Sequence, residues 1–465
     1  MSSQAKKMFR RQLLSYVALL MIPPASALTH PEQITLAPPL MLSPLICKGQ
    51  IQLAQEQSLV KDEKHLIPHS HAGFITVDEK LGNHLFFWFF PSTSGPESPL
   101  VVWLNGGPGN PSSLGLLNEN GPIRPLNDSY ASRIISWTQT MSMLYIDNPV
   151  GVGYSYSDSG VSGYRKDQDG YSKDLYEFIE QFYLLFPEYL NRDLYIGGKS
   201  YAGNYVLAFA HRLHLEIKAG RSIIRLAGIY IGGPSFDLHN QALASTDYWL
   251  ATGAISKKQA TEQKRRVVEL FEEFKQNQFN FRSTDELYPR LIVHKGRVFY
   301  NFANNYYSGE PQVQTFAEVE GLMNSIPMRN LVHVGDREYL FIDSPVGSYL
   351  VQDFMSSSTS KLATLLEEKY KVLIYTGDLD ALISPAMVDA ALLSMKWSRR
   401  QEYQDSKRSV WWGGNGNDEL FGFYSRVGNL CQVVIKGAGH SAGHDQPGRV
   451  FEMMNLFLQQ GCIGV

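Results

Sequence analysis

From about Leu85 onward, short apolar runs alternate with stretches in which apolar residues recur at helical spacing. The short runs are rich in branched and aromatic residues, which is typical of strands. Strands that are apolar along their whole length indicate a parallel sheet covered by helices on both faces. The sequence therefore predicts an α/β fold with a mainly parallel central sheet. We expect strands at 85–90, 100–104, 143–147, 194–198, 226–233, 371–377 and 431–440, and helices at 174–189, 204–217, 385–395 and 449–458.

The alternation stops after Asp237 and returns near residue 365, so an insertion is predicted to split the sheet. The charged run 257–278 within it is predicted to be helical, and Gly413 to Asn417, "GGNGN", is predicted to be a loop or hairpin connection. With 465 residues, 44% of them hydrophobic, the chain is long enough for one large core of this kind. We assign 28–237 to the first part of the core, 238–364 to a largely helical insertion or cap, and 365–465 to the second part.

The first residues resemble a secretory signal peptide. A basic start that includes Lys6 and Arg11 precedes a short apolar run at 13–22, and Ala25-Ser26-Ala27 has the small-x-small pattern of a cleavage site. The alternative is an uncleaved membrane anchor, but the apolar run is shorter than a bilayer-spanning helix requires. We therefore expect residues 1–27 to be removed and the chain to enter the secretory pathway, for secretion or lysosomal delivery.

Charge and cysteine usage narrow the classes of partner. The formal net charge of −3 gives no indication of nucleic-acid binding, and no later run predicts a stable membrane insertion. Three cysteines, Cys47, Cys431 and Cys462, allow at most one intramolecular disulfide and leave one thiol free. Asn127-Asp128-Ser129 is an N-glycosylation sequon, which predicts an exposed position at Asn127.

The stretch "YIGGKSYAGNYV", Tyr195 to Val206, contains a serine between an apolar strand and a helical run. A strand–turn–helix with small residues around a serine is typical of the nucleophile elbow of hydrolases, although Ala202 replaces the last glycine of the usual motif. The small residues are needed because the turn is tight and the following helix packs closely. Taken alone, a serine in a tight turn such as Ser200 is more often structural than catalytic.

Two further polar residues follow predicted strands. Asp378 and Asp380 come just after the strand at 371–377, and His440 comes at the end of the run at 431–440. Catalytic groups of α/β sheets gather at the carboxyl ends of strands, and the order Ser…Asp…His is that of α/β-hydrolases. Each residue has an alternative interpretation, as a turn former or a loop histidine. Their occurrence together, in this order, favours a catalytic triad.

A glycine-rich loop, "WLNGGPGN" at 103–110, follows another predicted strand. Such a loop lets backbone N–H groups approach a developing oxyanion. A phosphate loop would need a Lys-Ser or Lys-Thr pair after the glycines, and none is present. "GVGYSY" at 151–156 lacks the third glycine of a dinucleotide fingerprint. The loop therefore indicates an oxyanion hole.

These motifs together resemble those of the serine carboxypeptidases, which have the α/β-hydrolase fold. The resemblance covers nearly the whole mature chain, and some segments are most similar to the vitellogenic carboxypeptidase-like branch. It is carried by "WLNGGPG", "GLLNENGP" (115–122), "MLYIDNPVGVGYSY" (143–156), "KSYAGNYV" (199–206), "YTGDLDALIS" (375–384) and "KGAGHSAGHDQP" (436–447).

The resemblance implies that single amino acids are removed from peptide C-termini. It implies Ser200 as the nucleophile, His440 as the general base and Asp380 as the partner of the histidine. Asp380 would hold the histidine in one tautomer, and the backbone N–H groups of Gly107 and Tyr201 would form the oxyanion hole. No cofactor and no metal are implied.

The resemblance also implies a subsite for the α-carboxylate of the substrate, formed by Trp103, Asn105, Gly106 and two protonated glutamates. One glutamate is present as Glu119, but the other position is Lys199. Two facing acids work only when they share a proton, which favours acidic pH. Lys199 could instead pair with Glu119 or bind the substrate carboxylate, and activity would then extend toward neutral pH. The alternative is that the ammonium fills the subsite and impairs activity.

Further departures from the family pattern concern the same cleft. Asn110 and Pro111 replace a usual cysteine and serine after the glycine-rich loop. Ser441 replaces a large apolar residue after the histidine, and Gly443 replaces a common proline. None of these changes removes a member of the predicted triad.

Two other functions stay open at this point. One is a catalytically impaired secreted binding or yolk-type protein of the same fold, and the other is an esterase or acyltransferase on the same scaffold. A metal site is not expected, because His69-x-His71 and His211-x-x-His214 lack a third ligand at suitable spacing. The oligomeric state, including a homodimer, is also left open.

Overall fold

The computed structural model describes residues 36–127, 129–276, 293–294, 297–298, 301–302, 312–341, 344–414 and 418–464. Ala37–Val465 forms one compact unit, which is the part considered below. The predicted signal peptide at 1–27, Asp128 of the sequon and residues 415–417 of the "GGNGN" connection lie outside the described residues, as does much of 277–311.

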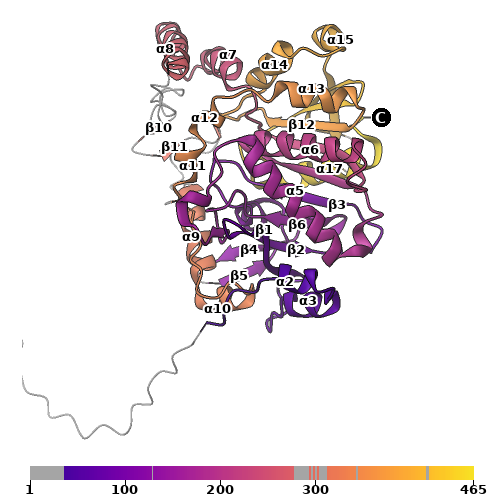
Figure 1. The fold of residues 1–465 in the computed structure, drawn as a ribbon. Helices are drawn as coiled ribbons and strands as arrows, with labels where there is room; N and C mark the ends of the chain where they lie inside the picture. Colours follow the sequence, from indigo (N-terminus) through magenta and orange to yellow (C-terminus); the bar gives the residue numbers. More distant parts are fainter. Residues whose placement is uncertain are drawn as a thin grey trace, which may run out of the picture. The chain divides into compact units, whose positions relative to one another are not determined.

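A central sheet dominates this unit, and within the described residues it has 11 strands. Its strands are β1 (His71–Asp78), β2 (Asn83–Phe90), β3 (Leu100–Leu104), β6 (Ser142–Ile146), β7 (Tyr156–Ser157), β8 (Leu194–Lys199), β9 (Leu226–Gly232), β12 (Lys371–Gly377), β13 (Ser409–Gly413), β14 (Glu419–Val427) and β15 (Leu430–Ile435). They lie in the order β1-β2-β6-β3-β8-β9-β12-β15-β14-β13, and β7 pairs with β2 (Figure 1).

The middle of the sheet is parallel and both edges are antiparallel. Strands β6, β3, β8, β9, β12 and β15 pair in parallel, whereas β1 and β2 at one edge and β14 and β13 at the other pair antiparallel. The prediction of a mainly parallel sheet is thereby confirmed. Two small antiparallel pairs lie outside it, β4 (Ile123–Leu126) with β5 (Ser129–Ser132) and β10 (Val293–His294) with β11 (Arg297–Val298).

Most of the helices connect strands of the sheet or belong to the predicted insertion. They are α2 (Ser43–Cys47), α3 (Ile51–Ser58), α4 (Ser113–Gly115), α5 (Gln168–Leu185), α6 (Ala202–Lys218), α7 (Leu238–Ala251), α8 (Lys257–Lys275), α9 (Gln312–Asn324), α10 (Ile326–Leu331), α11 (Val346–Tyr349), α12 (Val351–Phe354), α13 (Thr359–Glu367), α14 (Pro385–Ser394), α15 (Arg400–Asp405), α16 (Ala442–Asp445) and α17 (Pro447–Gln460). Short turns of π-helix and 3₁₀-helix are η1 (Leu116–Asn120), η2 (Trp137–Gln139), η3 (Gly160–Gly163) and η4 (Pro187–Tyr189).

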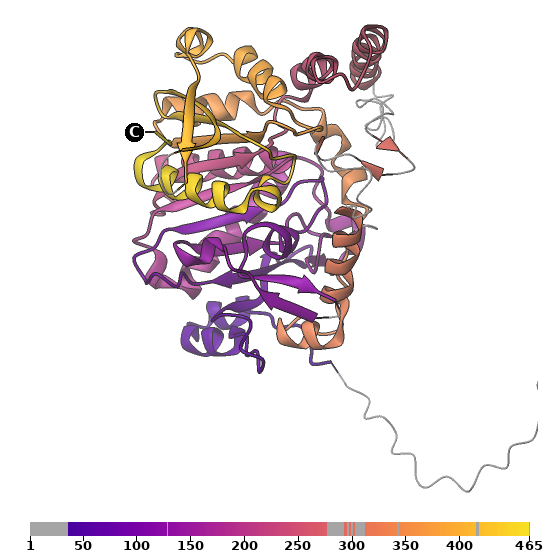
Figure 2. The ribbon, with the colours of Figure 1, turned by 180° about the vertical axis from the view of Figure 1, so that it is seen from behind.

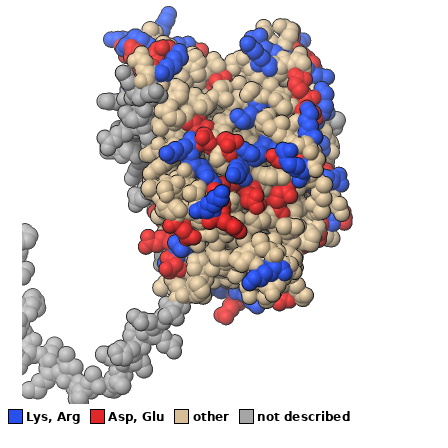
Figure 3. All heavy atoms as spheres, viewed as in Figure 1, with Lys and Arg blue, Asp and Glu red and all other residues tan. Residues whose placement is uncertain are grey.

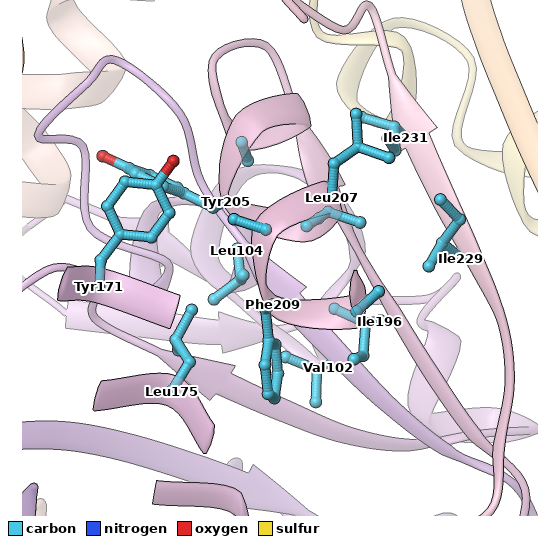
Figure 4. Close-up of a cluster of buried hydrophobic side chains, with 14 of the residues drawn as sticks. Val102, Leu104, Tyr171, Leu175, Ile196, Tyr205, Leu207, Phe209, Ile229 and Ile231 are labelled. Atoms are coloured by element: carbon cyan, nitrogen blue, oxygen red, sulfur yellow. The ribbon is translucent and has the colours of Figure 1, made fainter. Parts of the chain in front are cut away.

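The sheet is buried on both faces, as its continuous apolar strands predict. Along β12, Val372 and Ile374 belong to a core shared with α5 and α6, whereas Leu373 and Tyr375 face the opposite core, which includes Phe457 of α17. This alternation follows from the two-residue period of a strand. Figure 4 shows the first core, where side chains of α5 and α6 meet those of β3, β8 and β9, and Figure 2 shows α17 on the other face.

Two predicted strands, 100–104 and 371–377, have the observed bounds of β3 and β12. The prediction of a strand up to residue 440 is wrong, because β15 ends at Ile435. A turn follows in which Gly437 has a φ of +75°, and this conformation ends the strand. The functional consequence is that His440 lies on a loop beyond β15.

The helices α7 to α12 lie along one side of the sheet in Figures 1 and 2. Helix α8 begins with a capping box, in which Ser256 and Gln259 each accept a hydrogen bond from the other's backbone N–H. Helix α7 contacts the segment after β12, because the indole of Trp249 donates to the carbonyl oxygen of Ala381 at 3.0 Å. Helix α7, at the start of the predicted insertion, thus packs against the segment that follows the carboxyl end of β12.

Cys431 and Cys462 form a disulfide, and Cys47 is free and exposed, within the one-bridge limit that three cysteines impose. The described helices include none that is long and apolar enough to cross a membrane.

On the face viewed in Figure 3, acidic and basic side chains are intermixed. Ion pairs that involve exposed side chains include Arg212–Asp169 and Lys218–Glu368.

A histidine pair lies at the β1 edge of the sheet. His71, 8% exposed, has Nδ1 at 2.9 Å from the Ser58 hydroxyl and Nε2 at 3.3 Å from Nε2 of His69. Burial, together with the neighbouring His69 and His333, lowers the pKa of His71 from its usual 6.5 to about 4. The unfolded chain therefore binds more protons between these two pH values, so the folded state loses stability as pH falls from 6.5 toward 4.

We predict that this histidine alone lowers the free energy of unfolding by about 2 kcal/mol between pH 7 and pH 5. The measurement is urea denaturation at both pH values for the wild type, His71→Asn and His239→Asn, which changes an exposed histidine. The pH-dependent loss should be smaller by this amount in His71→Asn and unchanged in His239→Asn. Equal losses in all three proteins would contradict the prediction.

Candidate active site

Ser200 lies in a tight turn between β8 and α6. Its φ is +61°, a left-handed conformation that is strained for a serine and typical of a nucleophile elbow. The turn requires small neighbours, because a Cβ on Gly198 would lie 2.1 Å from the carbonyl oxygen of Leu104 and one on Gly203 would lie 2.6 Å from that of Ser235. The sequence folds in this way because glycine occupies both points of close approach.

Asp380 and His440 form a buried pair. Oδ2 of Asp380 is 2.9 Å from Nδ1 of His440, and the two side chains are 0% and 3% exposed. The other carboxylate oxygen, Oδ1, accepts the N–H groups of Leu382 and Ile383 at 2.8 and 2.9 Å. Because an ionised carboxylate can only accept, the proton of a neutral His440 lies on Nδ1, which leaves Nε2 as a base.

The ends of neighbouring strands bring this pair to the serine. The N–H of Ser200 donates to the carbonyl oxygen of Gly232 at 2.9 Å. A Cβ on the next residue, Gly233, would lie 3.0 Å from Oδ2 of Asp380 and 3.1 Å from Nδ1 of His440. Three residues that are far apart in the sequence therefore gather around Gly232 and Gly233, at the carboxyl end of β9.

The loop that carries His440 is held by two aspartates. Asp378 accepts the ammonium of Lys436 at 2.8 Å and the N–H of Gly437 at 2.7 Å, while Asp445 accepts the N–H of Gly439 at 2.7 Å. Asp445 was not among the sequence-based candidates. Its position inside the "GHDQP" segment was a signal, but its bond to Gly439 depends on how the loop folds back.

The glycine-rich loop after β3 lies against the serine turn. A Cβ on Gly106 would be 2.5 Å from the backbone nitrogen of Tyr201 and 2.9 Å from Cβ of Ser200. The structure records no hydrogen bond from the N–H of Gly107 or of Tyr201 to another described residue. Both donors are therefore available to a bound group, as the predicted oxyanion hole requires.

Asn105 has an unused amide in a buried position. Its Oδ1 accepts the indole N–H of Trp103 at 2.6 Å, and its backbone N–H donates to Ser112 at 3.1 Å. Asn105 is only 1% exposed, yet its Nδ2 has no hydrogen-bond partner among the described residues. A buried donor without a partner is costly, so this amide is a candidate donor to a ligand that accepts hydrogen bonds.

Lys199 pairs with Glu119, which is one of the two arrangements predicted from the sequence. Its ammonium contacts Oε1 of Glu119 and donates to the Ser441 hydroxyl at 2.7 Å. A Cβ on Gly443 would lie 3.2 Å from Cβ of Glu119. Lys199 and Gly443 lie against Glu119 and Ser441 lies against Lys199, so the three positions that the resemblance singled out as departures meet at one ion pair.

A small pocket opens beside this ion pair. It is lined by Leu114, Asn118, Glu119, Lys199, Phe316, Ser441 and His444. Two of these residues are sequence neighbours of the predicted triad: Lys199 precedes Ser200, and Ser441 follows His440. The described residues contain no cluster of three or more histidines, cysteines, aspartates or glutamates that could hold a metal.

Comparison with known proteins decides the family. A family model described as serine carboxypeptidase matches residues 62–460. The chain belongs to the serine carboxypeptidase family. The family resemblance and the α/β-hydrolase fold predicted from the sequence are confirmed.

Individual relatives of this serine carboxypeptidase are similar over most of its length. "Probable serine carboxypeptidase CPVL" of Homo sapiens is 38% identical over 432 residues, covering 90% of this chain and 89% of the relative. "Vitellogenic carboxypeptidase" of Aedes aegypti is 32% identical over 440 residues, covering 91% of each. "Venom serine carboxypeptidase" of Apis mellifera is 33% identical over 435 residues, covering 90% of each.

A solved structure has the same fold. The crystal structure of Kex1(delta)p, a prohormone-processing carboxypeptidase from Saccharomyces cerevisiae, matches with a TM-score of 0.74 at 22% identity, covering 87% of this chain and 96% of that chain. The chain thus has the same fold as that carboxypeptidase.

The buried pair Lys199–Glu119 predicts a coupling between its two partners. Lys199→Met leaves Glu119 buried without a cation and should destabilise the enzyme by about 3 kcal/mol. Glu119→Gln in the same background removes the unpaired charge and should restore most of this loss. Thermal or urea unfolding of both single variants and the double variant measures the coupling, and additive effects would contradict it.

Proposed function

We propose that this enzyme releases single amino acids from the C-termini of peptides and proteins through an acyl-enzyme intermediate. Ser200 is the nucleophile, His440 is the general base and Asp380 orients the histidine. The N–H groups of Gly107 and Tyr201 stabilise the oxyanion. Family membership supports the reaction class, and the geometry around Gly232 and Gly233 supports these roles.

In the proposed mechanism, Oγ of Ser200 attacks the last peptide carbonyl carbon while Nε2 of His440 takes the serine proton. The carbonyl oxygen becomes negative and receives the two N–H donors. His440 then protonates the leaving amine, and the C-terminal amino acid departs. Water attacks the acyl-enzyme by the same proton transfers, which frees the shortened peptide and regenerates Ser200.

The observation that carries the exopeptidase assignment is the unpartnered amide of Asn105. A carboxylate oxygen is an acceptor that would satisfy Nδ2 in a buried position. The loop of Asn105 and Gly106 lies against the serine turn, so a carboxylate bound there would be close to the reacting bond. We propose that Trp103 holds the amide in this orientation, and that Gly106, Glu119 and Lys199 complete the subsite.

Lys199 gives the proposed subsite an unusual charge balance. Two facing glutamates would need a shared proton, and therefore acidic pH. Lys199 instead forms an ion pair with Glu119, and this ion pair does not require acidic pH. The proposal is therefore a carboxypeptidase whose activity on peptides extends toward neutral pH.

This proposal predicts different pH profiles for the wild type and Lys199→Glu. In the variant, two carboxyl groups face each other and must share a proton, so kcat/KM at pH 7 relative to pH 5 should fall by about tenfold or more. The measurement is kcat/KM of a blocked dipeptide from pH 4 to pH 8. The same acidic maximum for both proteins would rule the idea out.

A second prediction separates the proposed reaction from the alternatives. Peptides with a free C-terminal carboxylate should be hydrolysed, whereas the same peptides with an amidated C-terminus should not. A fluorophosphonate should label the wild type and not Ser200→Ala. Labelling with hydrolysis of simple esters only would favour the esterase or acyltransferase, and absence of labelling would favour a non-catalytic protein.

We further propose that the enzyme acts in the secretory pathway, either secreted or in lysosomes. The signal-like residues 1–27 support this, as do relatives named for venom and vitellogenesis. Asn127 is exposed between β4 and β5, which is compatible with glycosylation at this position.

A further inference from the structure

The side chain of Tyr201, the residue after Ser200, is fixed by helix α12 of the insertion. Its hydroxyl donates to Oδ2 of Asp353, and its ring stacks on Phe354 with centroids 5.5 Å apart and planes at 21°. Tyr205, one turn further along α6, packs edge-on against the same ring at 5.0 Å. Two consecutive residues of a short helix thus hold one side chain of the serine turn.

Asp353 is itself firmly held. The residue is 5% exposed, and Oδ2 also accepts the hydroxyl of Tyr171 from α5 at 3.0 Å. Just after α12, the backbone N–H of Ser358 donates to the carbonyl oxygen of Phe236 at 2.7 Å, and its hydroxyl donates to Asn204 of α6 at 2.6 Å. The segment that carries this carboxylate is therefore anchored to α6 through Ser358, independently of Tyr171.

The proposed mechanism requires the backbone N–H of Tyr201 to point at the oxyanion. Oxyanion donors are effective only when they are held in place before the reaction. The strained turn at Ser200 precedes this N–H, and α6 begins directly after it. The bond from the Tyr201 hydroxyl to Asp353 fixes the far end of the ring and so restricts rotation of the whole residue.

We propose that Asp353 is a positioning residue, which holds the Tyr201 side chain so that the Tyr201 N–H keeps its direction toward the oxyanion. The inference rests on the proposed function, since this N–H matters only for acyl transfer. It gives the insertion a role in the chemical step, through α12. Substrate binding at Asn105 and Glu119 is not expected to depend on it.

The test compares Asp353→Ala, Asp353→Asn, Tyr201→Phe and Tyr171→Phe. Asp353→Ala and Tyr201→Phe should lower kcat for a blocked dipeptide by about tenfold, less than the 10²–10³ that follows loss of a whole oxyanion donor, with KM nearly unchanged. Asp353→Asn keeps an acceptor oxygen and should recover kcat to within about threefold of the wild type. Tyr171→Phe is the matched control, because it removes a bond to the same oxygen without touching the turn.

Fluorophosphonate labelling gives a second readout of the oxyanion donors. In that reaction Oγ of Ser200 bonds to phosphorus, His440 takes the serine proton, and fluoride leaves, while the phosphoryl oxygen occupies the oxyanion hole. The labelling rate should fall about tenfold in Tyr201→Phe and stay near the wild-type rate in Tyr171→Phe.

An unchanged kcat in folded Asp353→Ala, or equal losses in Tyr201→Phe and Tyr171→Phe, would overturn the inference. If Asp353→Ala does not fold, the pair of tyrosine variants decides alone. A wild type that neither hydrolyses peptides nor reacts with the fluorophosphonate would overturn the proposed function and the inference together. The two failures are thus distinguishable.

Discussion

The parallel pairing of β8, β9, β12 and β15 is the constraint on which the site depends. The carboxyl ends of parallel strands all lie at the same end of the sheet. Residues that follow these strands therefore meet, whatever their separation in the sequence. Ser200 follows β8, Gly233 follows β9, Asp380 follows β12, and His440 lies on the loop after β15. The hydrogen bond from Ser200 to Gly232 and the close approach of Gly233 to Asp380 and His440 join these ends into one centre.

A buried ion pair accommodates the charge of Lys199 in the cleft. A lysine beside the serine would be expelled from a buried position unless an acid met it there. Glu119 supplies that acid, Ser441 offers an acceptor, and Gly443 leaves space next to Glu119. The three positions that the resemblance singled out as departures therefore meet around one ion pair.

Local patterns predicted the parts of this protein that depend on neighbouring residues. The serine turn is recognisable because its glycines and its serine are adjacent, and β3 and β12 because their residues are apolar without interruption. Strands β13 and β14 were missed, since exposed and half-buried residues interrupt their apolar runs. His440 lies beyond the carboxyl end of a strand, as predicted, although that strand, β15, is shorter than expected.

Contacts between distant segments were harder to predict. From the sequence, Lys199 could pair with Glu119 or bind the substrate carboxylate, and only the fold places Glu119 against it. Asp353 carries no motif at all, and its relation to Tyr201 arises because α12 returns to the start of α6. Such residues become visible only when burial and hydrogen-bond partners are known.

The seam between β9 and β12 has a consequence for the newly made chain. These strands pair in parallel, yet Gly232 ends one and Lys371 begins the other, with the whole insertion between them. A growing chain that has completed β9 already contains the serine, but neither the aspartate nor the imidazole that would activate it. In the proposed mechanism the triad therefore becomes complete only after β12 and the loop after β15 have joined β9, so activity depends on the last part of the chain to be made.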